Sequence, residues 1–313
     1  MSLLADLDRW KDGGVITGPQ HAALTALVRK DSFSLFAELN ALLYLGVVSF
    51  VAGAGWTIQA HFASLGDVAI LSALTATFLA SLYYCFTRAA SYSHAQQESP
   101  GFAFDYVLYL GCLMFGLELG FLEWRFQLLK DSWDHYLLLS SLVYAVLAYR
   151  FDNRLVLSLA LSTLAGWFGF RLFRLQWFSG SLRVDALIYS ALVASAGVVL
   201  HRAGIKKHFL EAYMHVAVNV ALAAAVTGVF DVSASLIYLV VLLGLGVGSV
   251  IAGLRFQRFA FVAYGVIYSY IGLSHLFLRN TFNSTVTFAY YAVSATIVIV
   301  FLVVAARRFG RDA

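Results

Sequence analysis

The stretch FDYVLYLGCLMFGLELGFLEW, residues 104–124, decides the fold of this 313-residue chain. Its only charged residues are Asp105, Glu118 and Glu123, and the rest is predominantly apolar. A helix needs about 20 predominantly apolar residues to cross the hydrocarbon core of a bilayer. Comparable stretches recur from Asn40 to Ala306 with brief polar interruptions, so the sequence predicts a chain whose solvent is a membrane.

The overall composition supports a membrane protein and gives no sign of an enzyme. Hydrophobic residues make up 61% of the chain and charged residues 12%, too apolar a balance for an ordinary soluble domain. Cys85 and Cys112 fall inside apolar segments, so neither a disulfide framework nor a cysteine metal site is predicted. The sequence contains no H-E-x-x-H, G-x-S-x-G, Walker A or Rossmann fingerprint. We expect no metal site, no cofactor and no nucleic-acid partner.

The apolar runs between charged breaks predict an all-α, polytopic transmembrane helix bundle of about ten spans. The predicted domains are a cytoplasmic N-terminal helical hairpin at 1–38 and a transmembrane helical bundle at 39–313. The spans are expected at 39–59, 68–86, 104–122, 136–149, 155–173, 186–200, 212–230, 235–254, 259–277 and 286–306.

Charge asymmetry predicts the orientation of the bundle. If the N-terminus is inside, fifteen of the 21 lysines and arginines fall on the inner side, where positively charged loops are retained. Five of the 6 tryptophans then lie at or near the outer interface, which favours amphipathic rings. Both termini are therefore expected in the cytoplasm.

The inner basic turns are regularly spaced. The segments AYRFDNR, LHRAGIKK, GLRFQRF and AARRFGR each follow an outer-to-inner span, and their first arginines are 52, 53 and 52 residues apart. This period accommodates two spanning helices and two turns, so it predicts tandem helical hairpins, although any chain of alternating spans has basic inner loops. The candidate residues of these turns are Arg150, Arg154, Arg202, Lys206, Arg255, Arg258 and Arg307.

The N-terminal stretch LDRWKDGGVITGPQHAALTALV, residues 7–28, predicts two short helices joined by a glycine turn. Thr17 or Gly18 is the expected cap of the second helix. Because such short helices bury little apolar surface alone, we expect them to dock on the cytoplasmic face or on another chain.

This stretch resembles the N-terminus of the bacterial membrane family catalogued as domain of unknown function 2157 (DUF2157). The family typically has a leucine and a tryptophan, then a turn, then a Gln or Glu that opens the next helix. In this sequence these features correspond to Leu7 and Trp10, to Gly14-Val15-Ile16-Thr17, and to Gln20. The resemblance implies a multi-span protein of the bacterial cytoplasmic (inner) membrane. The family brings no established catalytic residues, so the resemblance implies no mechanism.

Glu118 is the main candidate for a functional polar group within a span. Ionisable residues inside a membrane are costly and suggest a functional site. Glu118 could carry protons, or it could be a structural tie that pairs with Arg171 or bonds to a neighbouring helix. In either role we expect it to face the bundle interior.

A second candidate site is a group of arginines on the predicted outer side. Guanidinium groups suit the oxygens of phosphate, carboxylate or an anionic headgroup, although these arginines could equally snorkel or neutralise nearby carboxylates. The group consists of Arg171, Arg174, Arg183 and Arg279.

The histidines do not predict a metal or haem site. His201, His208 and His215 recur every seven residues, but the outer two would be about 21 Å apart on a continuous helix. A simpler interpretation is a basic patch with Lys206 and Lys207 that faces anionic lipid.

Three function classes remain. The leading interpretation is a non-enzymatic membrane scaffold or accessory subunit of a larger complex, because the chemistry of the chain is sparse. The alternative is a carrier for a lipid-like or small anionic solute, with proton coupling through Glu118. An intramembrane enzyme comes last, for want of a nucleophile and base. The expected partners are membrane lipids and either other membrane subunits or further copies of the chain.

Overall fold

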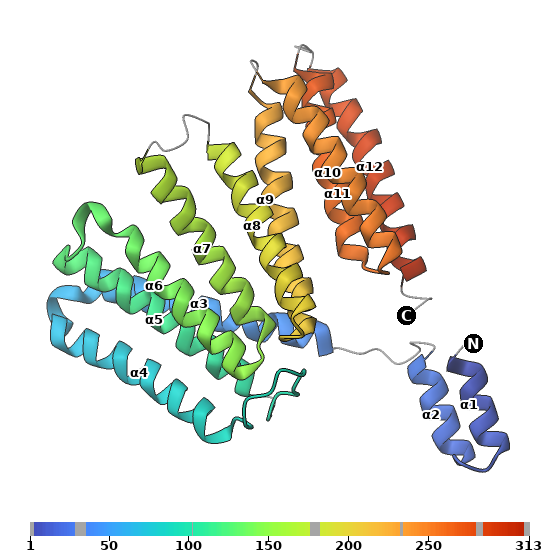
Figure 1. The fold of residues 1–313 in the computed structure, drawn as a ribbon, viewed down its shortest axis with the longest axis horizontal. Coiled ribbons are helices and arrows are strands. Elements are labelled where there is room, and N and C mark those ends of the chain that lie inside the picture. The colour runs from blue at the N-terminus through green and yellow to red at the C-terminus, as the bar shows by residue number, and fades with distance from the viewer. Residues whose placement is uncertain are drawn as a thin grey trace. The chain divides into compact units, whose positions relative to one another are not determined.

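The computed structural model describes residues 3–28, 36–101, 103–175, 182–231, 234–279 and 284–309 (Figure 1). Within these ranges the regular structure is helical throughout and contains no strand. The chain divides into two compact units, Met1–Leu65 and Gly66–Ala313, which we describe separately. The division of the chain into a cytoplasmic part, 1–38, and a membrane part, 39–313, stays a prediction.

The first unit begins with two short helices whose junction is fixed by a capping box. The backbone N–H of Gln20 donates to Thr17 Oγ1 at 3.4 Å, and the N–H of Thr17 donates to Gln20 Oε1 at 2.9 Å. His21 Nε2 lies 2.8 Å from Asp8 Oδ1 across the pair, and Leu7 is buried. The helices of this unit are α1 (Leu3–Asp12), α2 (Gly18–Val28) and α3 (Phe36–Leu65).

The second unit is a series of long helices in which sequential neighbours pack on one another. Figure 1 shows α7 to α12 side by side, with connections at alternate ends. Two 3-10 turns, η1 (Lys130–Ser132) and η2 (Lys207–Phe209), precede α6 and α9. The helices are α4 (Asp67–Arg88), α5 (Phe104–Phe126), α6 (Asp134–Phe151), α7 (Arg154–Leu175), α8 (Leu182–Arg202), α9 (Leu210–Val229), α10 (Ser235–Arg255), α11 (Phe259–Leu278) and α12 (Ser284–Phe309).

Each of the ten predicted spans coincides with one of the helices α3 to α12. Among the described residues, 8 helices are long and apolar enough to cross a membrane: α3, α4, α5 and α8 to α12. In α7 the searched residues give a shorter apolar stretch, Arg154–Gly169, because the side chains that follow lie outside the described part of the chain, and α6 does not qualify. The all-helical, multi-span prediction is therefore confirmed, whereas the count of ten stays a prediction.

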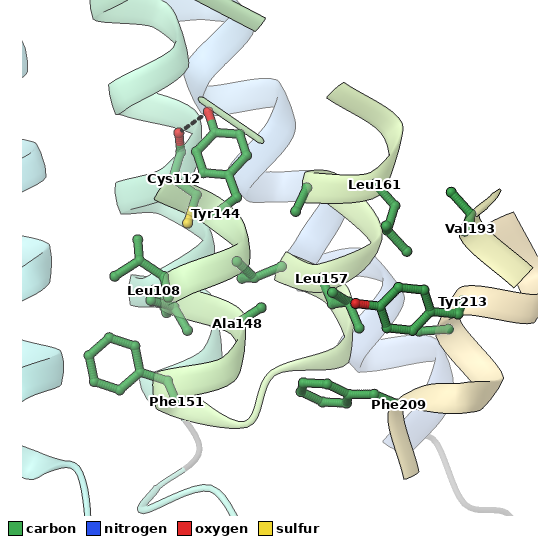
Figure 2. Close-up of a cluster of buried hydrophobic side chains, with 14 of the residues drawn as sticks. Leu108, Cys112, Tyr144, Ala148, Phe151, Leu157, Leu161, Val193, Phe209 and Tyr213 are labelled. Carbon is green, nitrogen blue, oxygen red and sulfur yellow. Dashed lines mark hydrogen bonds between the residues drawn. The ribbon is translucent and has the colours of Figure 1, made fainter. Parts of the chain in front are cut away.

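The core of the second unit lies on α9, which belongs to two buried clusters. In the first, Tyr213 of α9 packs with Leu157 of α7 and Val193 of α8 (Figure 2). In the same cluster the Tyr144 hydroxyl donates to the carbonyl of Cys112 at 2.6 Å, which ties α6 to α5 (Figure 2). The second cluster joins α9 to α10, so α9 has neighbours on both sides.

Candidate functional site

Glu118 is held at the packed junction of α4 and α5. The Thr75 hydroxyl on α4 donates to Glu118 Oε1 at 2.5 Å, and the glutamate is half-buried. The neighbouring Gly116 lies against Tyr144, whose hydroxyl would be 2.7 Å from an added Cβ, whereas nothing lies within 4 Å of a Cβ at Gly120. The carboxylate therefore has a protein partner on a neighbouring helix, as a structural tie requires.

We expect Thr75 and Glu118 to be energetically coupled. In a double-mutant cycle of Thr75→Val and Glu118→Met, the coupling energy should be about 0.6 kcal/mol and at most about 1.7, the range of hydrogen bonds between membrane helices. Thermal unfolding in detergent measures it. Thr77→Val is the matched control, because Thr77 Oγ1 donates to Ala73 of its own helix at 2.8 Å. Equal coupling of Glu118 to Thr77 would contradict the tie.

The structure describes the side chains of two of the four predicted outer arginines, Arg183 and Arg279. Arg183 Nη1 donates to Asp231 Oδ2 at 2.7 Å, so this arginine neutralises a carboxylate. Arg279 is exposed at the end of α11. Arg171 and Arg174 lie on α7, but their side chains are outside the described residues, and so is the proposed pairing of Arg171 with Glu118.

Three of the predicted inner basic turns begin at the ends of alternate helices. Arg150, Arg202 and Arg255 lie in the last turns of α6, α8 and α10. Arg150 donates to the carbonyl of Ala90 at 3.0 Å. The other members have different surroundings: Lys206 is buried, Arg154 and Arg258 meet at Glu211, and Arg202, Arg255 and Arg307 are exposed.

Lys206 corrects one sequence-based interpretation. It does not face lipid, because its side chain is 0% exposed and its Nζ lies 3.0 Å from Asp152 Oδ2 in the turn between α6 and α7. Asp152 is 2% exposed; it also contacts His208 Nε2 and accepts the N–H of Gln97 at 2.6 Å. The backbone N–H of Lys206 donates to His94 at 3.1 Å. We call Asp152, Lys206 and His208 the buried ionic cluster. It joins the turn between α6 and α7 to the turn before α9. Its contacts with His94 and Gln97 also join it to the connection between α4 and α5.

A second ionic group surrounds Glu211 in the first turn of α9. Glu211 Oε2 lies 3.2 Å from Arg154 Nη1 at the start of α7, and its Oε1 lies 3.2 Å from Arg258 Nη1 in the turn before α11. His215, one turn along α9, has its Nε2 3.7 Å from Glu211 and its ring stacked on Phe261. A single carboxylate thus bridges two arginines that are 104 positions apart in the sequence.

These charges stand at one end of an apolar groove of about 960 Å³, lined by α8, α9 and α10. We name it the α9 groove. Small residues at helical spacing, which share a helix face, line it beside larger apolar residues such as Leu187 and Met214. The small residues are Ala191 and Ala194 of α8, Ala217 and Ala221 of α9, and Gly244, Gly248 and Ala252 of α10.

The glycines of α10 show why the groove is open. An added Cβ at Gly244 or Gly248 would meet nothing within 4 Å, whereas at Gly246, on the other face of the helix, it would collide with Ser269 of α11. From Glu211 to Ala221 the groove follows α9 for about 15 Å, about half of the ~30 Å hydrocarbon core. The length of the groove along α9 therefore matches the thickness of the hydrocarbon region of one leaflet.

The polar end of the α9 groove carries a surplus of positive charge. Arg154, Lys207 and Arg258 contribute three positive charges and Glu211 one negative charge, which leaves a surplus of two. His208 also lines this end and contacts Asp152. An apolar groove with a cationic end can accept an apolar chain that carries an anionic head.

Sequence reasoning found Arg154 and Arg258 but not their meeting point. Two of the regularly spaced histidines, His208 and His215, take different partners, Asp152 and Glu211. The signal that could have located the groove is the spacing Gly244, Gly248 and Ala252, which lines one face of α10.

The length, apolarity and packing of these helices define a polytopic α-helical membrane protein. Residues 8–157 match the family described as "Predicted membrane protein (DUF2157)". The match covers just under half of the chain and confirms the resemblance of the N-terminal stretch. Comparisons with curated proteins and with solved structures gave no match. Glu211, Arg258 and most of the α9 groove lie beyond the matched residues.

Proposed function

We propose that this chain is a non-enzymatic membrane protein that holds a lipid-like molecule in the α9 groove. The observation that carries the proposal is the groove itself, about 960 Å³ in volume, apolar along its length and charged at one end. Lipid-binding sites combine apolar walls with a few polar groups that fix the orientation of the ligand. Glu118 is not among the groove's lining residues, so the proposal does not depend on proton coupling.

The proposed topology places the polar end of the groove at the cytoplasmic surface. We propose ten spans made of tandem hairpins in the bacterial inner membrane, with both termini and the α1–α2 pair in the cytoplasm. Arg150, Arg202 and Arg255 end α6, α8 and α10, and positively charged ends are retained inside. The ligand would then come from the cytoplasmic leaflet.

Two roles are compatible with a held lipid. In an accessory subunit the lipid would be a long-lived part of a larger assembly, whereas in a carrier it would exchange. The exposed apolar residues of α12, such as Phe288, Val293 and Ile297, offer a surface to lipid or to another subunit.

Purification in a mild detergent, followed by native mass spectrometry, tests the proposal. We expect one lipid to remain bound to the wild-type chain and to be lost in Gly248→Phe, because a large side chain at Gly248 enters open space in the groove. Gly120→Phe, at another glycine whose Cβ would meet nothing within 4 Å, is the control and should retain the lipid. Equal lipid retention by wild type and Gly248→Phe would contradict the proposal. Co-eluting chains and the rate of lipid exchange separate a subunit from a carrier.

A further inference from the structure

We propose that the α9 groove selects anionic phospholipids, with Arg154, Arg258 and Lys207 holding the phosphate. This inference rests on the proposed lipid-binding function and adds the chemical class of the ligand. It is carried by the juxtaposition of three cationic side chains from three separate turns at the polar end of one apolar groove.

The geometry around Glu211 leaves the arginines able to bind a phosphate. Glu211 lies 3.2 Å from a single Nη1 atom of each arginine, whereas a guanidinium carries five N–H donors in a planar fork. The side chain of Arg154 is 45% exposed and that of Arg258 57%, while Glu211 is 24% exposed. Glu211 therefore engages one donor atom of each arginine, and the other donors can reach a ligand.

The charge balance favours an anionic headgroup over a zwitterionic one. The surplus of two positive charges at the groove end exceeds the single negative charge of a phosphodiester, so the phosphate needs no accompanying cation. A zwitterionic headgroup would add an ammonium group beside the arginines, where like charges repel. The nearby buried ionic cluster does not compete for the ligand, because Lys206 and His208 both contact Asp152.

The depth of the groove also fits a lipid rather than a soluble anion. A soluble phosphate would use the polar end alone and leave the apolar walls from Met214 to Ala221 exposed. An acyl chain covers these walls over the ~15 Å that α9 provides, so headgroup and chain are both accommodated.

Binding of defined lipids to the delipidated full-length chain tests the inference. Native mass spectrometry in detergent would compare dioleoyl phosphatidylglycerol with dioleoyl phosphatidylcholine, which share their acyl chains. We expect the wild-type chain to prefer phosphatidylglycerol, and Arg154→Gln and Arg258→Gln to weaken its binding roughly five-fold each, with little change for phosphatidylcholine. Arg255→Gln is the matched control, because Arg255 is an exposed arginine at the end of α10, three residues before Arg258, but does not line the groove.

A variant that is expected to strengthen binding distinguishes loss of the site from loss of folding. Glu211→Gln keeps both arginines and raises the surplus from two positive charges to three, so it should strengthen phosphatidylglycerol binding several-fold. An unfolded variant could not produce this gain. The inference is overturned if Arg255→Gln weakens binding as much as Arg154→Gln, or if Glu211→Gln does not strengthen it.

The same assay separates this inference from the proposed function. If the wild-type chain binds both lipids equally and Gly248→Phe abolishes both, the groove holds lipid without headgroup selection and only the inference fails. If Gly248→Phe affects neither lipid, both proposals fail.

Discussion

Replacing Lys206 by methionine is expected to lower the free energy of unfolding by about 3–5 kcal/mol, the usual cost of breaking a buried ion pair. The substitution leaves the Asp152 carboxylate, 2% exposed, without the ammonium group 3.0 Å away. His208 remains in contact with Asp152, which should keep the loss near the lower end of this range. Thermal unfolding in detergent, followed by circular dichroism, measures the effect.

Two variants give this prediction its controls. Lys207→Met makes the same chemical change at an exposed neighbour and should change stability by less than about 0.5 kcal/mol. Adding Asp152→Asn to Lys206→Met removes the uncompensated charge, so the double variant should be more stable than Lys206→Met alone. Similar unfolding temperatures for the Lys206 and Lys207 variants would show that the buried ionic cluster contributes little.

The second large effect is expected at the crossing of α10 and α11. A Cβ at Gly265 of α11 would collide with the backbone carbonyl of Gly246 of α10, and a backbone atom cannot rotate away as a side chain can. Gly265→Ala should therefore cost about 1–3 kcal/mol through overpacking. The change in the midpoint of thermal unfolding, compared with wild type in the same detergent, measures this cost.

Gly248→Ala on α10 is the matched control for Gly265→Ala. Its Cβ would meet nothing within 4 Å, and alanine has the higher helix propensity, so this variant should be unchanged or stabilised by up to about 1 kcal/mol. If Gly248→Ala were as destabilising as Gly265→Ala, the packing of α10 described here would be incorrect.

The sequence predicted the helices well because membrane spans depend on local composition. The predicted spans 235–254 and 259–277 differ by one residue from Ser235–Arg255 and Phe259–Leu278. Apolar length sets these limits, and the charged residues at the ends mark them. The count of ten spans stays a prediction, because α6 falls below the criteria for a span and the last turns of α7 contain residues whose side chains lie outside the described part of the chain.

The sequence did not predict the burial of Lys206 or the α9 groove, because both depend on contacts between distant segments. Lys206 and Asp152 are 54 positions apart, and a lysine in a basic turn is normally solvated. Gly244, Gly246 and Gly248 look equivalent in the sequence. Only the arrangement of the neighbouring helices shows that Gly246 packs against α11 while the other two line the groove.

An experimental structure of the full chain in a nanodisc that contains phosphatidylglycerol would show whether a lipid occupies the α9 groove. The account predicts elongated density between α8 and α10 above Ala217 and Ala221, continuous with a headgroup beside Arg154 and Arg258. It would be contradicted by direct contact of α8 with α10 across Gly248, or by a protein side chain from another subunit filling the same space.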